Sequence, residues 1–516
     1  MHPGIHAAAD PDKPAVIMAG SGRVTTYRQL DDGAHRAAHA LRAAGAAPGD
    51  HVAFQLGNGP AFFELLWAAQ RSGLVYTAVS TRLGPEETAY IVADCGATVF
   101  VTDAALAGVV DTLGDGRLGD GVACHLAGGT ANGWRSWEEA LALAPAGPLL
   151  GPYAGDDMLY SSGTTGRPKG VLHPLAAAAI DEPDPLTLGC QMVWGMGADT
   201  VYLSPAPLYH AAPLRFTRSV HRLGGTVVSM EHFDAAELLR LIGRYGVTAA
   251  QVVPTMFIRM LALPRAQRAA AELTTLRTVI HAAAPCPVPV KQRMIEWWGP
   301  IIWEYYAGTE ANGMLLCDAQ EWLAHPGTVG QPRGGEVHIV GDDGSEVPPR
   351  AIGTVYLGGG APFEYLNDPE GTAACRHPNG WTTLGDIGYL DEDGYLYLTD
   401  RKADMIISGG VNVYPQEAEN VLAAHPEVAD VAVFGVPDED LGEVPLAVVE
   451  PVSMQRAGPE LEQELLTYCR DRLAHYKCPT SVDFEAALPR HPTGKLYKRL
   501  LRDRYREGPA AGDEQA

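Results

Sequence analysis

The stretch 160-YSSGTTGRPKGVLH-173 gathers hydroxyls, glycines and two cations into one short loop. Glycine lets backbone amides approach an anion closely, hydroxyls add hydrogen-bond donors, and a lysine adds a compact positive charge. This composition predicts a loop that binds phosphate, while a surface linker is the alternative that composition alone leaves open. The residues expected to hold the phosphates are Ser161, Ser162, Gly163, Thr164, Thr165, Gly166 and Lys169.

The spacing excludes a Walker-type P-loop, which requires the pattern G-x-x-x-x-G-K-[ST]. Counted from Gly163, the second glycine of that pattern would fall on Pro168, and Lys169 is followed by Gly170. Apolar residues precede the loop, and 170-GVLH-173 follows it. We therefore expect the loop to join two strands.

The elements that must position this loop alternate between helix and strand. An amphipathic helix is predicted at 26–45, a buried strand at 51–56, a helix at 60–73 and a strand at 74–79. The same alternation resumes between 200 and 284. It indicates an α/β fold with a largely parallel sheet, here in two similar subdomains.

The residue pattern changes after about residue 330. Short apolar runs separated by Gly and Asp-Gly predict strands of a small β subdomain there. A compact α+β unit of about 110 residues follows it. The expected division is an N-terminal domain at 1–400, a short hinge at 401–404 and a C-terminal domain at 405–516.

The formal net charge of the 516 residues is −24. Such an acidic surface repels nucleic acid and anionic membranes, so neither is expected as a partner. The basic run 495-KLYKRLLRDRYR-506 is interpreted as a solvated or salt-bridged helix face. The N-terminus lacks the pattern of a signal peptide, no long apolar run is present and no cysteines form a CxxC pair, which together predict a cytoplasmic protein.

The loop at 160–173 resembles the phosphate loop of the adenylate-forming superfamily, which contains acyl-CoA synthetases, luciferases and the adenylation domains of peptide synthetases. Further motifs of that superfamily follow in the expected order, so the resemblance covers nearly the whole chain. They are 281-HAAAPCP-287, 305-YYAGTE-310, 383-TLGDIGYLDEDGYLYLTDRKADMIISGGVNVYPQEAE-419 and 489-PRHPTGKLYK-498. The pattern is most similar to bacterial fatty-acyl, steroid- and terpenoid-acid CoA ligases.

This resemblance implies two half-reactions. A carboxylic acid and ATP, with Mg²⁺, would form acyl-AMP and pyrophosphate, and CoA would then displace AMP. The C-terminal domain would be mobile and rotate between the two steps, so that one fold presents two active sites in turn.

The resemblance also implies roles for single residues. Tyr306 would stack on adenine, Thr309 would bond the α-phosphate, and Glu310 would hold Mg²⁺ together with Thr165. Lys495 would draw the substrate carboxylate and the α-phosphate together and stabilise the charge of the transition state. Lys495, Thr165 and Glu310 are therefore predicted catalytic residues.

Other residues are expected to line the nucleotide and CoA sites. Asp386 would accept hydrogen bonds from both ribose hydroxyls, and Arg401 would be a second contact to ribose and phosphate. The loop 406-IISGGVN-412 would line the pantetheine tunnel. The remaining residues of these sites are Ala282, Ala283, Ala284, Tyr305, Ala307, Gly308, Ser408, Gly409 and Gly410.

The sequence departs at three places from the pattern that the resemblance implies. Ala403 stands at the hinge position where Asp or Lys is common, and Asp404 follows it. Alanines occupy 282–284, where glycines are frequent. Ala311 follows Glu310, where glycine is expected.

The acyl-pocket stretch 205-PAPLYHAAPLRF-216 contains no acidic residue that could hold an α-ammonium group, so an acid without one is favoured. His210 resembles the family's aromatic gate residue and is a predicted catalytic residue, while the small Ala211 and Ala212 leave room for a bulky acyl group. The expected substrate is therefore a fatty or bulky alicyclic acid, steroid- or terpenoid-like.

Two alternatives remain open from the sequence. The protein could perform one half-reaction only, either passing acyl-AMP to a carrier protein or thioesterifying a supplied acyl-AMP. A non-catalytic nucleotide-binding module is the alternative from another class. The expected partners are the acid, ATP and CoA, with a homodimer as the expected assembly.

Overall fold

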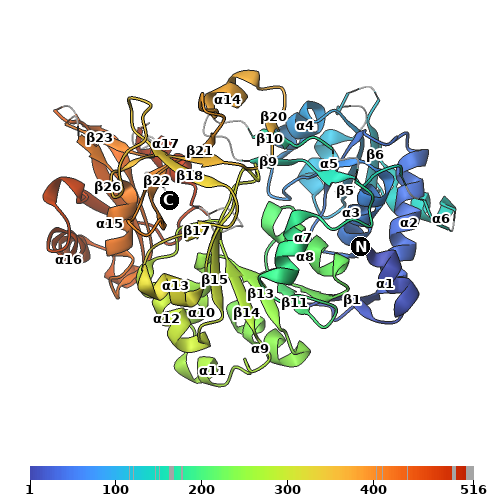
Figure 1. Cartoon of the computed structure of the whole chain (residues 1–516), viewed down its shortest axis with the longest axis horizontal. Coiled ribbons are helices and arrows are strands. Elements are labelled where there is room, and N and C mark those ends of the chain that lie inside the picture. Colours follow the sequence, from blue (N-terminus) through green and yellow to red (C-terminus); the bar gives the residue numbers. More distant parts are fainter. Residues whose placement is uncertain are drawn as a thin grey trace, which may run out of the picture.

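The structure is a computed structural model and describes residues 1–114, 117–119, 121–145, 147–149, 151–161, 168–175, 178–401, 404–409, 411–438, 440–490 and 496–506. Its regular elements form an α/β fold of five sheets. In Figure 1 the first helices, in blue, lie on the opposite side of the molecule from the C-terminal elements, in orange and red.

The first sheet confirms the predicted helix and strand alternation. Its strands all pair in parallel, in the order β7-β6-β5-β3-β4-β8. They are β3 (His51–Gln55), β4 (Val75–Ala78), β5 (Ala97–Asp103), β6 (Ala123–Ala127), β7 (Arg135–Ser136) and β8 (Asp156–Asp157).

The two helices predicted in this first unit, at 26–45 and 60–73, begin and end close to the predicted positions. For example, the helix predicted at 26–45 is α2 (Tyr27–Ala43), which Thr26 and Gln29 start with a reciprocal capping box. The others are α1 (Pro3–Ala9), α3 (Pro60–Ser72), α4 (Pro85–Asp94), α5 (Ala107–Leu113) and α6 (Trp137–Leu143).

The second sheet is larger, with parallel central strands and antiparallel edges, in the order β17-β16-β15-β14-β13-β11-β12-β1-β2. Its strands are β1 (Pro14–Met18), β2 (Val24–Thr26), β11 (Val201–Ser204), β12 (Thr226–Ser229), β13 (Ala249–Val252), β14 (Thr278–His281), β15 (Ile302–Tyr306), β16 (Leu315–Cys317) and β17 (Gln331–Pro332).

The helices that accompany the second sheet follow the same alternation (Figure 1). They are α7 (Pro185–Met192), α8 (Ala211–Arg222), α9 (Ala235–Tyr245), α10 (Pro254–Leu261), α11 (Arg265–Ala269), α12 (Val288–Trp298) and α13 (Ala319–Ala324). Two similar α/β subdomains are thus present, as the sequence predicts.

One strand assignment could not be made from local pattern. The first strand of the chain, β1, pairs in parallel with β12 of the second sheet, with Val16 opposite Val227. The N-terminal segment therefore completes the second subdomain before the chain builds the first one.

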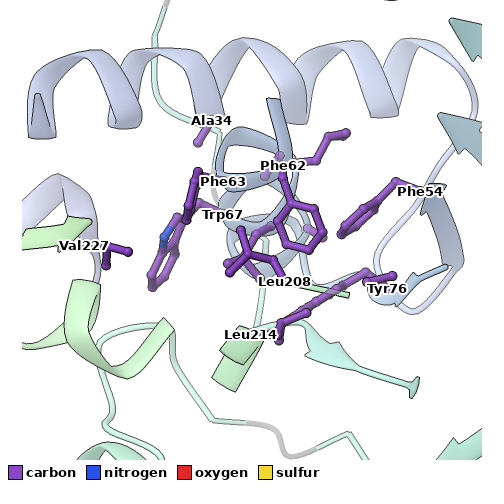
Figure 2. Close-up of a cluster of buried hydrophobic side chains, with 14 of the residues drawn as sticks. Ala34, Phe54, Phe62, Phe63, Trp67, Tyr76, Leu208, Leu214 and Val227 are labelled. Carbon is purple, nitrogen blue, oxygen red and sulfur yellow. The ribbon is translucent and has the colours of Figure 1, made fainter. Parts of the chain in front are cut away.

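A shared apolar core joins the two α/β subdomains (Figure 2). The aromatic rings of α3 lie between the strands of the first sheet and helix α8 of the second subdomain. Phe63 and Trp67 are fully buried, and Trp67 Nε1 donates a hydrogen bond to His221 Nδ1 at 3.1 Å. Burial of each large aromatic ring stabilises the fold by about 2–3 kcal/mol, so this contact holds the two subdomains in a fixed relation.

Two small antiparallel sheets lie beside the large ones. The three-stranded sheet has β9 (Leu159–Ser161), β10 (Lys169–Leu172) and β20 (Glu364–Tyr365), and α14 (Pro369–Ala374) follows β20. The four-stranded sheet is the predicted β subdomain, with β18 (Glu336–Val340), β19 (Gly353–Gly358), β21 (Thr382–Leu390) and β22 (Leu396–Arg401).

The C-terminal elements form the predicted α+β unit around a fifth sheet. Its strands are β23 (Ile406–Ser408), β24 (Val411–Val413), β25 (Val428–Asp438), β26 (Gly442–Pro451) and β27 (Ser481–Phe484). Its helices are α15 (Pro415–Leu422), α16 (Pro459–Arg470) and α17 (Lys498–Arg506), with 3₁₀ turns at Met454–Arg456 and His475–Lys477.

The basic run near the C-terminus is a salt-bridged helix face, as predicted. On α17, Lys498 pairs with Glu419 at 2.8 Å and Arg502 with Asp404 at 2.9 Å. Within the described residues, no helix combines the length and the apolar character that crossing a bilayer requires.

Candidate functional site

Two paired strands lie at either end of the loop at 160–173, which confirms that the loop joins two strands. Strands β9 and β10 pair antiparallel, and Ser161 lies directly opposite Lys169. Lys169 Nζ forms an ion pair with Asp368 at 2.8 Å and lies 4.9 Å from the ring centroid of Tyr365. The predicted phosphate ligands that lie outside the described residues are Ser162, Gly163, Thr164, Thr165 and Gly166.

Strand β15 carries the predicted adenine residues to the edge of the small β subdomain. Tyr305 is buried and packs on Phe216 of α8, with the two ring centroids 5.9 Å apart. Tyr306 points the other way along the strand and packs against the apolar core of the four-stranded sheet. Its hydroxyl donates a hydrogen bond to Asp386 Oδ2 at 2.5 Å, which brings two predicted nucleotide residues together.

A tight turn follows β15 and presents Thr309 and Glu310. The N–H of Ala311 donates to the carbonyl oxygen of Gly308 at 3.2 Å and closes the turn. Glu310 is only 6% exposed, and its Oε1 accepts a hydrogen bond from the Tyr365 hydroxyl at 2.9 Å. Burial, with the neighbouring Glu310 carboxylate, raises the pKa of Tyr365, so this hydroxyl keeps its proton and remains a donor.

Two of the departures from the family pattern have left-handed backbone. Ala283 has φ +77° and Ala311 has φ +48°, a region that glycine enters without the steric cost that a Cβ brings. Ala282 is buried, whereas Ala283 is exposed at the end of β14. Glycine would suit 283 and 311 for this conformational reason.

The ribose end of the predicted site lies on a β-hairpin. Asp386 on β21 is 6% exposed and stands opposite Arg401 on β22 in the strand register. Backbone pairing therefore places both predicted ribose contacts at one end of the hairpin. The side chain of Arg401 is outside the described residues, as is Ala403.

The predicted gate residue stands at the start of helix α8. His210 is the N-cap of α8, has extended backbone and packs edge-on against Tyr209, with the ring centroids 4.5 Å apart. The neighbouring Ala211 and Ala212 are half-buried against the shared core. Small apolar side chains thus surround the first turn of this helix.

The predicted CoA residues lie in the C-terminal sheet rather than with the nucleotide residues. Ser408 ends β23, and Gly409 follows with φ +55° while its N–H donates to the carbonyl of Leu441 at 2.8 Å. Gly410 and Lys495 lie outside the described residues.

A scan against protein-family models matches residues 5–364 to the family described as AMP-binding enzyme, and residues 417–495 to its C-terminal domain. The chain belongs to the AMP-binding enzyme family. This confirms the predicted resemblance to adenylate-forming enzymes. The predicted hinge at 401–404 falls between the two matched ranges, but the domain boundaries themselves stay a prediction.

Known members of the family resemble the chain over nearly its full length. The feruloyl-CoA synthase of an Amycolatopsis species is 35% identical over 500 residues, covering 95% of this chain and 96% of the relative. The long-chain-fatty-acid–CoA ligase of Mycobacterium tuberculosis is 33% identical over 508 residues, covering 97% of each. These relatives confirm the prediction of an enzyme of the AMP-forming acid–thiol ligase class.

A solved structure confirms the fold. The ATP-bound crystal structure of MatB from Rhodopseudomonas palustris aligns with a TM-score of 0.83 and 29% identity, covering 98% of this chain and 99% of that one. A large N-terminal part of two α/β subdomains and a small β subdomain, followed by a small C-terminal domain, is therefore the architecture of this family member.

The turn that carries Glu310 fits the Mg²⁺ that AMP-binding enzymes are expected to use. A Cβ added to Gly308 would lie 2.5 Å from Glu310 Oε2, so the space beside this oxygen exists because residue 308 is glycine. One buried carboxylate beside the hairpin that carries the predicted phosphate loop is a donor set that suits Mg²⁺, which takes few protein oxygens and several phosphate oxygens.

Sequence reasoning missed two residues of this site, Tyr365 and Asp368. They bond to Glu310 and Lys169, respectively, and both belong to the segment 364-EYLND-368. The local sequence of this segment is typical of an ordinary polar turn. A tyrosine and an aspartate near the predicted β subdomain are the sequence features that could have indicated a site residue here.

Proposed function

We propose that the protein is an acyl-CoA ligase that activates a fatty or bulky alicyclic carboxylic acid with ATP. In the first half-reaction a carboxylate oxygen attacks the α-phosphorus, the bond to pyrophosphate breaks and acyl-AMP forms. In the second, the thiolate of CoA attacks the acyl carbonyl and AMP leaves. The observation that carries this proposal is the convergence of Tyr306, Glu310, Asp386 and Lys169 at the junction of three sheets.

The described residues suit the first half-reaction. Tyr306 and Asp386 would hold adenine and ribose, and their mutual hydrogen bond pre-orients both side chains. Lys169 would receive the departing pyrophosphate, and Glu310 would hold Mg²⁺, which supplies Lewis-acid stabilisation of the phosphate charge. Lys495 would bring the two anions together, and Thr165 would be a second contact for the metal.

The acyl end of the site supports an apolar acid without an α-ammonium group. The partly buried side chains of Ala211, Ala212, Trp303 and Met314 pack against the shared core near α8. The buried Asp157 beside this helix is already paired with two arginines and would not serve an ammonium group. His210 at the N-terminus of α8 would shield the carboxylate from water.

The second half-reaction would use the C-terminal domain, proposed at 405–516 and turning about the hinge at 401–404. Ser408, Gly409 and Gly410 would line the pantetheine tunnel after this rotation, and Arg401 would contact ribose and phosphate at the hinge. A cytoplasmic location and a homodimer complete the proposal, and size-exclusion chromatography of the purified protein tests the homodimer.

The direct test is a panel of fatty, aromatic and polycyclic acids, read by mass spectrometry for acyl-AMP and acyl-CoA separately. We expect acid-dependent pyrophosphate without CoA, and AMP plus acyl-CoA when CoA is present. No product with any acid of the panel would refute the proposal.

The same assay separates the alternatives. Product from synthetic acyl-AMP plus CoA, without product from ATP plus acid, indicates a ligase that does not adenylate. Acyl-AMP without acyl-CoA indicates an enzyme that feeds another acceptor. For the two-step enzyme, Lys495→Ala abolishes adenylation and spares thioesterification of supplied acyl-AMP.

A further inference from the structure

Helix α8 carries three arginine side chains on its buried face. Arg218 and Arg222 are less than 7% exposed, and Arg215 retains only 16% of its side-chain surface. Buried arginines are rare unless they are paired, so each needs a defined partner. The first residues of the helix belong to the predicted acyl-pocket stretch 205–216, and its arginines contact β8, the strand before the predicted phosphate loop, which makes these partners relevant to the site.

Each of these arginines forms an ion pair with at least one aspartate. Arg215 pairs with Asp157 at 2.8 Å, and Arg218 pairs with Asp156 at 2.9 Å and with the other oxygen of Asp157 at 3.1 Å. Both Arg218 and Arg222 reach Asp184. Three cations thus face three anions, so the group is neutral and does not present a spare charge to an anionic substrate.

Asp157 is ionised in this setting. Burial opposes its charge, but Arg215 and Arg218 outweigh burial and hold the pKa of Asp157 below its ordinary value. Asp157 belongs to β8, and β9 begins two residues later and ends at Ser161, where the phosphate loop starts. The Asp157 carboxylate therefore has a fixed position at the base of the phosphate hairpin, the pair of strands β9 and β10 that carries the predicted phosphate loop.

Arg215 alone among the three arginines also reaches the nucleotide turn. Its Nη1 and Nη2 each donate to the carbonyl oxygen of Thr309 at 3.3 Å, while Nε and Nη2 donate to Asp157 Oδ2 at 3.0 and 2.8 Å. A planar guanidinium with donors on two edges can make both contacts at once, which an ammonium cannot do with the same geometry.

We propose that Arg215 is a positioning residue for adenylation, which fixes the Thr309–Glu310 turn relative to the base of the phosphate hairpin. By holding the Thr309 carbonyl, it sets the orientation of the peptide unit between these two residues. The Thr309 hydroxyl and the Glu310 carboxylate then face the phosphates without reorganisation. This inference rests on the proposed adenylation function and names a residue that does not itself touch the substrate.

The position of Arg215 on α8 extends the proposal to the acyl group. Arg215 lies on the same helix as His210, one turn and a half further along. A single helix therefore carries both the predicted gate of the carboxylate site and the anchor of the nucleotide turn. Movement of α8 by a poorly fitting acid would be passed to Thr309 through this one side chain.

The test compares Arg215→Lys with Arg218→Lys in the full-length protein. Both variants keep a cation on the same buried helix beside Asp157, but only the first loses the paired donors to Thr309. We expect kcat for acid-dependent ATP–pyrophosphate exchange to fall roughly 10- to 100-fold in Arg215→Lys, because small misplacements of reacting groups cost about this much. We expect Arg218→Lys to stay within about threefold of wild type.

Thermal unfolding of both variants separates positioning from folding, because a merely structural role lowers the midpoint without lowering kcat of the folded protein. Arg215→Gln serves as a second variant if the lysine variant does not fold. Equal kcat values for Arg215→Lys and Arg218→Lys, with similar thermal midpoints, would overturn the inference.

Binding of ATP with Mg²⁺, followed by calorimetry, tests the inference independently of turnover. We expect Arg215→Lys to weaken this binding several-fold more than Arg218→Lys does. A wild type that forms no acyl-AMP refutes the proposed function but leaves this binding comparison decisive for Arg215. Equal binding in both variants would contradict a positioning role.

Discussion

The hydroxyl of Tyr365 lies 2.9 Å from Glu310 Oε1 and donates a hydrogen bond to it. Because β20 pairs with β10, Tyr365 is fixed to the hairpin that carries Lys169, with Tyr365 opposite Val171. One side chain thus joins the proposed metal carboxylate to the proposed phosphate loop, and this relation gives the first prediction.

Removing the charge of Glu310 is expected to abolish most adenylation. Glu310→Gln should lower the rate of ATP–pyrophosphate exchange by roughly 100-fold or more, as loss of a preorganised electrostatic group does. Tyr365→Phe is the matched control, because it keeps the carboxylate and removes only its donor; we expect a loss of about tenfold or less, partly recovered at high Mg²⁺. Equal losses in both variants would contradict the metal role of Glu310.

The ion pair of Lys169 with Asp368 is expected to compete with phosphate. Lys169 must exchange this carboxylate for pyrophosphate oxygens, and a partly exposed pair of this kind stabilises the fold by only about 0.2–1 kcal/mol. Asp368→Asn should therefore lower KM for ATP by about two- to fivefold, while asparagine still caps α14. The exposed Glu364→Gln on the same segment is the control, and a raised KM in Asp368→Asn would count against competition.

The two alanines with left-handed backbone are expected to be strained. Positive φ costs a residue with a Cβ about 1–2 kcal/mol, and the entropy of glycine offsets about half of this. Ala283→Gly and Ala311→Gly should each stabilise the protein by about 0.5–1 kcal/mol in denaturant unfolding. Ala270→Gly, at φ −85°, should instead destabilise it, and loss of stability in all three variants would contradict strain at 283 and 311.

Acid is expected to weaken the junction of the two α/β subdomains through His221. Burial lowers the pKa of His221 to about 4; the nearby His6 acts in the same direction, and the hydrogen bond that Nε2 donates to the carbonyl of Ala15 offsets only part of this effect. Nδ1 accepts a hydrogen bond from Trp67 across the junction. Between pH 6.5 and pH 4 the unfolded chain therefore binds a proton that the folded chain does not, so stability falls with falling pH by about 1.4 kcal/mol per unit.

The variant His221→Gln tests this dependence, since glutamine can both donate and accept but does not titrate. We expect its free energy of unfolding to depend less steeply on pH between 4 and 6.5 than that of wild type. An unchanged slope would show that other groups set the acid sensitivity.

Much of the fold could be predicted because its signals are local. The helix from Tyr27 to Ala43 is indicated by its own apolar periodicity and capping residues. The strands of the first sheet are short apolar runs between turn residues. The order of five motifs indicated the family, which the comparisons confirm, and from it Glu310, Asp386 and Lys169 are predicted site residues. None of this required knowledge of contacts between distant segments.

The sequence by itself determined the element types, the α/β class and the chemical groups available for binding ATP. Only the tertiary structure decided that β1 joins the second sheet, that Tyr365 reaches Glu310, and that Arg215 spans Asp157 and Thr309. The physical reason is that periodicity sets which face of an element is buried, whereas the partner of that face depends on packing the whole chain. A buried arginine, in particular, can be neutralised by any suitably placed carboxylate, and only the folded core selects which one.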